Sequence, residues 1–248
     1  MMAWRIHLLV VLTTAFLIVL SPSLTQGAEI SVHFIQSPLF DFFMATNMTF
    51  DRGSAKLILP GLNTCGCRSA CFTYGDGCKA WASVSLENGI TECRIANEGP
   101  MTLVPYGNGS STYFFKKSSV PGTYTWEADN LLYVALNGSM STQDAKNNCA
   151  KIPGHRLIIV KSKATYDHFL ARAAGNGQPF WVMDLKKKTS TELVWGDGTS
   201  PDPQIVYILL NSATELTFVL YDNHIEDAAE RQGPFRVLCQ ANPLGVQW

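Results

Sequence analysis

Two cysteines far apart in the sequence constrain this 248-residue chain more than any other feature. Cys149 lies in the segment QDAKNNCAKI, whose apolar residues recur at helical spacing, and Cys239 lies at the end of the apolar run PFRVLCQ. A bridge between them would tie the first helix of a domain to its last strand. The segments between these two cysteines are therefore the place to look for a functional site.

The N-terminus has the pattern of a secretory signal peptide. Arg5 precedes the apolar run His7–Leu20, and the small residues that follow, with Thr25 and Gly27, suit cleavage near residue 27. The alternative is a membrane anchor, but a run of 14 residues is shorter than the about 20 that cross a bilayer. We therefore predict that residues 1–27 are a signal peptide. The mature protein is then expected to be secreted, extracellular and not membrane-spanning.

The charge balance argues against a nucleic-acid partner. Without residues 1–27 the chain has 18 Lys plus Arg against 20 Asp plus Glu, which is a formal charge of −2. A nucleic-acid partner would require a basic face. The short basic run Lys186–Lys188 is interpreted as a solvated loop, with a polyanion site as the alternative.

All seven cysteines follow residue 27, and an oxidising compartment favours disulfides among them. Because seven is odd, at least one thiol has no partner within the chain. Three sequons, at Asn47, Asn108 and Asn137, predict N-glycosylation. Together these features predict a disulfide-bonded glycoprotein.

The first half of the chain contains a dense group of cysteines: Cys65, Cys67, Cys71, Cys78 and Cys93. Cys67 and Cys71 are four positions apart, so on a helix they share one face. The apolar segment 57–59 predicts a strand, and the segments CKAWASVSL and TECRIA predict a hairpin around the turn Glu87–Gly89. A metal site built from the cysteines is the alternative to disulfides, but no histidine lies nearby to support it.

This cysteine-rich segment resembles a PAN/apple-like module. The residues that carry the resemblance are the pair Cys67 and Cys71, the run Cys78–Trp81 and the run Cys93–Ile95. The resemblance implies bridges from Cys71 to Cys78 and from Cys67 to Cys93, although four cysteines by themselves allow three pairings. Modules of this family bind proteins or glycans and catalyse no reaction.

Cys65 is left over from that pairing. It is expected to be a free thiol, an intermolecular bridge that makes a disulfide-linked dimer, or the true partner in place of Cys67.

The stretch 118–123, SSVPGT, combines small residues with proline and glycine and predicts a linker between two domains. The predicted organisation is a signal peptide (1–27), a PAN/apple-like domain (28–117), a linker (118–123), a second domain (124–241) and a C-terminal tail (242–248).

The second domain begins with TWEADNLLYVAL, which suits one or two strands. Ser141 and Asp144 form a capping-box-like start for a helix that runs to about Ile152. The run RLIIV predicts a buried strand, and Ser162 caps a second helix that ends at Gly175–Gly177. The buried stripe of that helix is predicted to be Tyr166, Phe169, Leu170 and Ala173.

The order of these elements resembles the C-type lectin-like fold. After the helix with Cys149, the strand RLIIV and the second helix, the resemblance is carried by Trp181–Leu185, Trp195–Gly198 and Phe235–Cys239. It implies an α+β fold with antiparallel sheets and two helices, stapled by the Cys149–Cys239 disulfide. The smaller PAN/apple-like α+β domain precedes it.

Three residues of these motifs have two interpretations each. Trp181 and Trp195 are expected to fill the core, with sugar stacking as the alternative. Asp197, with the glycine that follows it, is expected to form a turn, with a catalytic role as the alternative.

Calcium-dependent members of this family bind sugars through carboxylate and amide side chains near the long loop. The resemblance implies that Asp202, Gln204, Glu226 and Asp227 bind carbohydrate, and that Glu215 joins them as a ligand of Ca²⁺. These side chains suit Ca²⁺, which takes six to eight oxygen ligands. The alternative is that they are ordinary solvated loop residues.

The chain departs from the family's pattern in this loop. Asp-Pro-Gln at 202–204 is neither Glu-Pro-Asn nor Gln-Pro-Asp, and it lies earlier than the expected place near Leu210–Ser212. The second loop disulfide is missing, because its positions correspond to Leu216 and Glu230. The run Ile205–Leu210 is apolar where the family has a polar loop.

The predicted function is secreted, lectin-like, non-catalytic glycan binding, in innate immune recognition of microbial surfaces. The alternative is a calcium-independent protein–protein interaction module that binds no sugar. An enzyme is not expected, because His155, His168 and His224 are scattered and no hydrolase or metalloprotease motif occurs.

Overall fold

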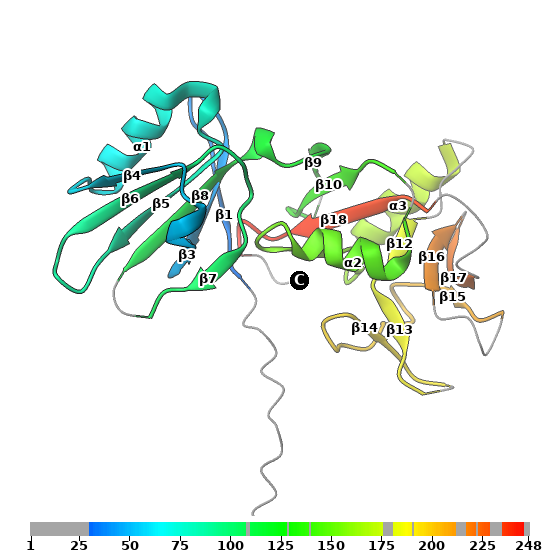
Figure 1. The fold of residues 1–248 in the computed structure, drawn as a ribbon. Coiled ribbons are helices and arrows are strands. Elements are labelled where there is room, and N and C mark those ends of the chain that lie inside the picture. Colours follow the sequence, from blue (N-terminus) through cyan, green and yellow to red (C-terminus); the bar gives the residue numbers. More distant parts are fainter. Residues whose placement is uncertain are drawn as a thin grey trace, which may run out of the picture.

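The computed structural model describes residues 30–107, 110–127, 129–138, 140–175, 181–189, 191–211, 217–221, 223–228 and 235–245. The predicted signal peptide lies outside this part of the chain. None of the described helices has the length and apolar character needed to cross a bilayer. Figure 1 shows two lobes, the first drawn in blue to green and the second in green to red.

The first lobe is a six-stranded antiparallel sheet with one helix on a face, and its strands pair in the order β1-β2-β8-β5-β6-β4. A separate two-stranded sheet pairs β3 with β7. The bounds are β1 His33–Ile35, β2 Phe42–Thr46, β3 Met48–Phe50, β4 Leu57–Pro60, β5 Ala80–Ser85, β6 Thr91–Ala96, β7 Leu103–Pro105 and β8 Ser111–Lys116, with 3-10 helices at Arg52–Ser54, Gly75–Gly77 and Lys117–Ser119. The predicted strand at 57–59 and the predicted hairpin of β5 and β6 are confirmed.

Helix α1 (Thr64–Tyr74) packs against β5 and β6 through the face that bears two buried cysteines. The Asn63 side chain caps its first turn by accepting a hydrogen bond from Gly66 N at 2.8 Å. Gly75, with φ of 62°, ends the helix, because a left-handed residue there breaks the helical hydrogen-bond pattern.

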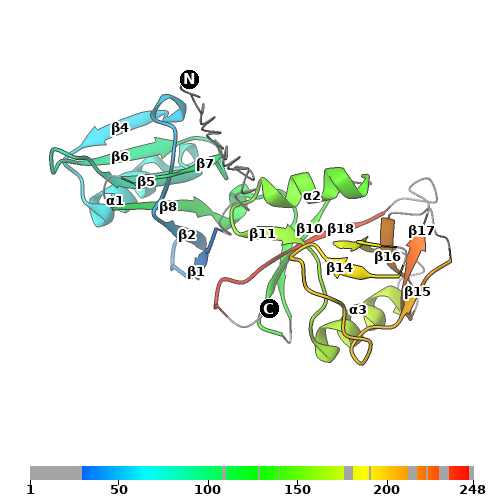
Figure 2. The same ribbon diagram turned by 90° about the horizontal axis from the view of Figure 1, so that it is seen from below.

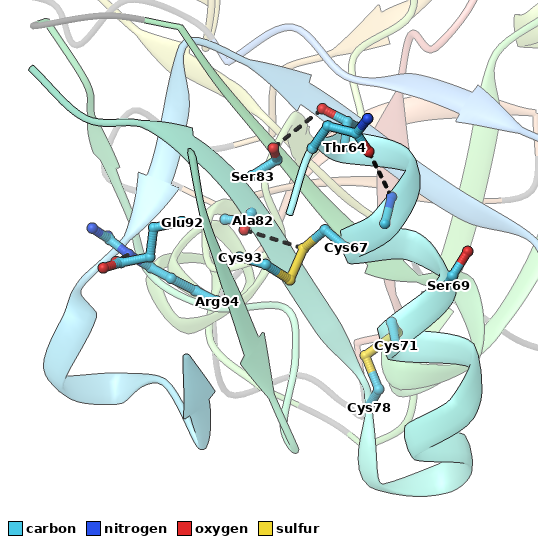
Figure 3. The surroundings of a disulfide bond; sticks show 12 residues. Thr64, Cys67, Ser69, Cys71, Cys78, Ala82, Ser83, Glu92, Cys93 and Arg94 are labelled. Carbon is cyan, nitrogen blue, oxygen red and sulfur yellow. Dashed lines mark hydrogen bonds and ion pairs between the residues drawn. A yellow bond between two sulfur atoms is a disulfide. The ribbon is translucent and has the colours of Figure 1, made fainter. Parts of the chain in front are cut away.

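Two disulfides fasten α1 to its neighbours. Cys67 is bonded to Cys93 of β6, and Cys71 is bonded to Cys78, as Figure 3 shows. These are the pairs that the PAN/apple-like resemblance implies. Cys65 is a free, exposed cysteine.

The described residues of the second lobe form two four-stranded sheets, a two-stranded hairpin and two helices. The sheet orders are β11-β18-β10-β9 and β12-β16-β17-β15, and the hairpin pairs β13 with β14; β15 and β17 are parallel, and the other pairs are antiparallel. The bounds are β9 Thr123–Trp126, β10 Leu132–Leu136, α2 Thr142–Ala150, β11 His155–Leu157, α3 Lys163–Gly175, β12 Trp181–Met183, β13 Leu185–Lys187, β14 Leu193–Trp195, β15 Ile208–Leu209, β16 Thr217–Tyr221, β17 His224–Ala228 and β18 Val237–Ala241.

The cap of α2 is as predicted. Ser141 Oγ accepts from Asp144 N at 3.1 Å and donates to the Asp144 carboxylate at 2.8 Å. The helix ends at Ala150, two residues before the predicted end, because Ile152 N turns back to donate to Cys149 O at 3.0 Å.

The cap of α3 is also as predicted, with Ser162 Oγ accepting from Thr165 N at 3.1 Å. Tyr166 and Phe169 are buried and Leu170 is partly buried, in agreement with the predicted stripe. The side chain of Ala173 and the predicted end of the helix after Gly175 lie outside the described part.

The disulfide between Cys149 and Cys239 joins α2 to β18. Strand β18 pairs with β10 on one side and β11 on the other, so this bond anchors the helix to the middle of its sheet. A bridge that spans 90 residues of sequence stabilises a fold by about 4–5 kcal/mol in the chain-entropy account.

The predicted strand Arg156–Val160 is shorter than expected. The ladder of β11 ends at Leu157, although residues 158–160 stay buried. Ile159 N donates to the side-chain Oε1 of Gln240, at 2.8 Å, in place of a backbone carbonyl.

The two lobes share an apolar contact. Phe43 of β2 lies with its ring centroid 5.5 Å from that of Tyr124 and 5.6 Å from that of His155, both in the second lobe. Val32 packs on Gly154, where a Cβ would lie 2.5 Å from its side chain. Figure 2 shows β1 and β2 on the side of the first lobe that faces the second.

His155 is a buried neutral group in this contact. Its Nδ1 donates to Pro153 O at 3.0 Å, since a carbonyl can only accept, and its Nε2 accepts from Tyr124 Oη at 3.0 Å. Burial lowers the pKa of His155 to about 4.

The buried His155 predicts a pH-dependent stability. An unfolded histidine has a pKa of about 6.5, so between pH 6.5 and 4 the unfolded state binds more protons than the folded state, and stability rises with pH. Lowering the pH from 7 to 4 should therefore remove about 3 kcal/mol through this residue. Urea denaturation at pH 7 and at pH 4 measures the free energy of unfolding of wild type and of His155→Gln. The loss of free energy between the two pH values should be larger for wild type by about 3 kcal/mol. Parallel pH dependences would contradict the assignment.

Candidate functional site

The predicted triplet at 202–204 forms a surface turn. Asp202 Oδ1 accepts from Gln204 N at 2.8 Å, and Asp202 O accepts from the backbone N–H groups of Ile205 and Val206. Both Asp202 and Gln204 are exposed. The Asp202 carboxylate therefore caps its own turn.

Asp227 of β17 is buried, with 4% of its surface exposed. Lys187 Nζ of β13 lies 2.8 Å from Asp227 Oδ2, and Asn211 N donates to Oδ1 at 2.5 Å. The lysine side chain is itself buried, so the interpretation of Lys187 as a solvated loop residue is wrong. The carboxylate is neutralised by a cation from the protein.

Glu226, the preceding residue, has different partners. Its Oε2 accepts from Asn211 Nδ2 at 3.1 Å and lies 3.2 Å from His224 Nε2. Successive side chains of a strand point to opposite faces, which separates Glu226 from the buried Asp227. The predicted sugar-binding residues are thus placed in three surroundings: an exposed turn, a partly exposed network and a buried ion pair.

Two of the predicted Ca²⁺ ligands have partners within the protein. Ca²⁺ takes six to eight oxygens, whereas Asp227 is occupied by Lys187 and Asp202 by its own turn. Within the described ranges, no group of three or more His, Cys, Asp or Glu side chains could hold a metal ion. Glu215, the fifth predicted ligand, and the loop positions Leu216 and Glu230 lie outside these ranges.

Two exposed tyrosine rings and the partly buried ring of His224 lie beside the Glu226 network, and we call Tyr207, Tyr221 and His224 the aromatic surface. Tyr207 is 60% exposed and Tyr221 is 44% exposed. The ring of His224 lies between them, with centroids 6.1 Å from Tyr207 and 6.4 Å from Tyr221. Large exposed rings grouped in this way are a mark of binding surfaces.

The backbone beneath the aromatic surface is held in place by Tyr166 of α3. Its hydroxyl accepts from Tyr207 N at 3.3 Å and lies 3.2 Å from Asn223 O. Ile225 N donates to Tyr207 O at 2.9 Å, which ties the loop to β17. The surface is therefore supported by the helix and the strand.

The sequence interpretation did not include this aromatic surface. The sequence feature that could have indicated this surface was the apolar run Ile205–Leu210, which lies where the family has a polar loop. The structure shows that Val206 is buried, whereas Tyr207, Leu209 and Leu210 are exposed.

The motif Trp195–Gly198 has a structural role. Trp195 is buried, and Asp197 Oδ1 accepts from Thr199 N and Thr199 Oγ1 in a turn that Gly198 closes with φ of 87°. Burial alone would raise the pKa of Asp197, but hydrogen bonds from Lys161 and Thr199 lower it overall. The turn is confirmed, and Trp181 is buried as predicted.

The other predicted surface residues are placed as follows. Asn47 and Asn137 are exposed, which suits N-glycosylation, and Asn108 lies outside the described residues. His168 pairs with Glu127, and His155 is buried.

Comparison with known proteins gives likenesses of structure but none of sequence. The sequence matches no protein-family model and no curated protein. Among solved structures, the chain is similar to the C-type lectin domain of murine dendritic cell inhibitory receptor 2, determined in complex with an N-glycan. The likeness has 17% sequence identity and a TM-score of 0.39, and it covers 45% of this chain and 90% of that chain. At this level it carries no argument about function.

The structure itself establishes a mixed α+β chain with few helices, mainly antiparallel sheets and three disulfides. These features agree with the class expected from sequence. The PAN/apple-like assignment of the first lobe and the domain boundaries stay predictions.

The Lys187–Asp227 pair predicts a large effect of a single substitution. Lys187→Met leaves Asp227 buried without a compensating charge, so the free energy of unfolding should fall by about 3–5 kcal/mol. Adding Asp227→Asn should recover part of this loss. Urea denaturation provides the measurement.

Lys188→Met is the matched control for Lys187→Met, because Lys188 pairs with Glu192 at the exposed surface. Its effect should stay within about 0.5 kcal/mol. Equal effects for the two lysines would show that the buried pair does not hold this region together.

Proposed function

We propose that the protein is a secreted, non-catalytic recognition protein that binds glycans through the aromatic surface. The observation that carries this proposal is the grouping of two exposed tyrosines around His224, beside the hydrogen-bonded pair Asn211 and Glu226. Tyrosine rings offer a flat apolar face with a polar edge, which suits the C–H faces and hydroxyls of a sugar. A few fixed polar groups beside an apolar wall are the usual composition of a small-molecule site.

Binding is proposed to be independent of calcium. The Lys187 ammonium supplies the positive charge that Asp227 requires. The ligand then contacts the rings of the aromatic surface, the Asn211 amide and the Glu226 carboxylate. Secretion belongs to the same proposal, because disulfides persist in oxidising compartments. A role in innate immune recognition of microbial surfaces is part of it as well.

A calcium-independent protein–protein interaction is the second candidate. The observation that favours it is the exposure of Leu209 and Leu210 next to Tyr207, which adds an aliphatic patch without hydrogen-bonding groups. Exposed apolar patches rimmed by polar residues also mark protein interfaces.

A glycan array with and without chelator tests the two candidates. We expect binding that chelator does not change, and we expect Tyr207→Ala and Tyr221→Ala each to weaken it about tenfold, which corresponds to 1.4 kcal/mol of lost ring contact. Tyr74→Ala is the matched control, since Tyr74 is an exposed tyrosine of the first lobe.

The other results of the array have definite meanings. Loss of binding in chelator would contradict calcium independence. A silent array for all variants would favour the protein-partner candidate. Unchanged glycan binding by both tyrosine variants would show that glycans bind at another site.

We also propose that Cys65 links two copies of the chain, because it is exposed in the first turn of α1 and has no disulfide partner within the chain. The mature protein should run as a dimer on non-reducing gels, and Cys65→Ser should run as a monomer. Rapid alkylation of Cys65 in the native protein would overturn this proposal.

A further inference from the structure

A small cavity of about 60 Å³ lies in the second lobe where α3 begins. The turn between β9 and β10 contributes Asp129 and Leu131, the segment after β11 contributes Ile159, and β18 contributes Gln240. A single water needs only about 10–15 Å³ of such volume, so the cavity can admit a small substituent of a larger ligand.

Gln240 presents an unused hydrogen-bond donor in this cavity. The residue is 1% exposed, and its Oε1 accepts from Ile159 N at 2.8 Å. An N–H group needs an oxygen acceptor, so this bond fixes which end of the amide is oxygen. The Nε2 at the other end has no hydrogen-bond partner among the described residues. Because Gln240 lines the cavity, a ligand bound there can supply the acceptor for this donor.

Asp129 presents a matching acceptor. Its Oδ2 accepts from Tyr133 Oη at 2.7 Å and from Thr165 Oγ1 at 2.5 Å, whereas its Oδ1 accepts from Leu131 N at 3.0 Å. A carboxylate oxygen can accept two hydrogen bonds, so Oδ1 retains one lone pair. The same contacts hold the carboxylate still.

The charge around the cavity disfavours an anionic ligand. Asp129 is negative, and the Lys161 ammonium at the cavity lies 2.5 Å from the Asp197 carboxylate. A cationic ligand would suit Asp129 but could not accept from Gln240 Nε2. A neutral group with one acceptor and one donor fits both.

We propose that this cavity binds an acetamido group. The ligand carbonyl accepts from Gln240 Nε2, the ligand N–H donates to Asp129 Oδ1, and the methyl group packs on Leu131 and Ile159, which are both buried apolar residues. Amino sugars and acetylated lysine carry this group. The proposal stands apart from the aromatic surface, because the two sites share no residue.

Titration of the ¹⁵N-labelled mature protein by NMR tests this site. N-acetylglucosamine should shift the Gln240 side-chain amide signals in a saturable way, whereas glucosamine, which has an ammonium in place of the acetamido group, should not. N-acetyllysine in a parallel titration shows whether the sugar or the peptide form binds more tightly, and saturable binding of either form supports the site. Equal responses to N-acetylglucosamine and glucosamine, or none to either acetamido compound, would overturn the proposal.

Two substitutions locate the binding. Gln240→Glu keeps the acceptor for Ile159 N but removes the donor, and it should weaken binding at least tenfold. Gln143→Glu is the matched control on the exposed face of α2 and should leave binding unchanged. Leu131→Phe fills the cavity without adding charge and should also abolish binding, which keeps the test valid if the glutamate variant does not fold.

A third variant separates this site from the proposed function. Tyr207→Ala should leave binding at the cavity unchanged even where it removes glycan binding to the aromatic surface. Loss of N-acetylglucosamine binding in Tyr207→Ala together with full binding in Gln240→Glu and Leu131→Phe would assign the ligand to the aromatic surface and refute the cavity.

Discussion

The disulfide between Cys149 and Cys239 joins the first helix of the second lobe to its last strand. It fastens α2 to β18, the strand that pairs with both β10 and β11, so the last segment of the chain becomes a central strand of its sheet. Successive side chains of a strand alternate between faces, and the residue after Cys239 is Gln240. The Cys149–Cys239 disulfide therefore also fixes the position of Gln240, whose amide accepts from Ile159 N and lines the small cavity.

The buried Lys187–Asp227 pair organises the other functional region. It joins β13 to β17, and Asp227 also accepts from Asn211 N, so one carboxylate positions a hairpin, a sheet and the loop between them. Two charges removed from water are tolerated because each neutralises the other and additional hydrogen bonds are made. With that charge satisfied internally, the outward side of the region is left to the rings of Tyr207 and Tyr221.

Local signals in the sequence predicted the local structure well. The caps at Ser141 and Ser162, the hairpin of β5 and β6, and the turn after Trp195 depend on residues only a few positions apart. Side chains from distant segments decided the points that were missed. The β11 ladder stops where Gln240, 81 residues further along the chain, supplies the acceptor, and Lys187 is buried because Asp227, 40 residues away, supplies its partner.

The sequence by itself determined the α+β class, the helix starts and the cysteines available for bridging, because periodicity and capping act over one or two turns of chain. Only the tertiary structure decided which carboxylates are exposed and which are neutralised, since that depends on the partner each acquires on folding. Three of the carboxylates predicted as one site show this: Asp202 caps a turn, Glu226 joins an amide and a histidine, and Asp227 is buried against a lysine. Side-chain chemistry alone made them equivalent, and burial made them different.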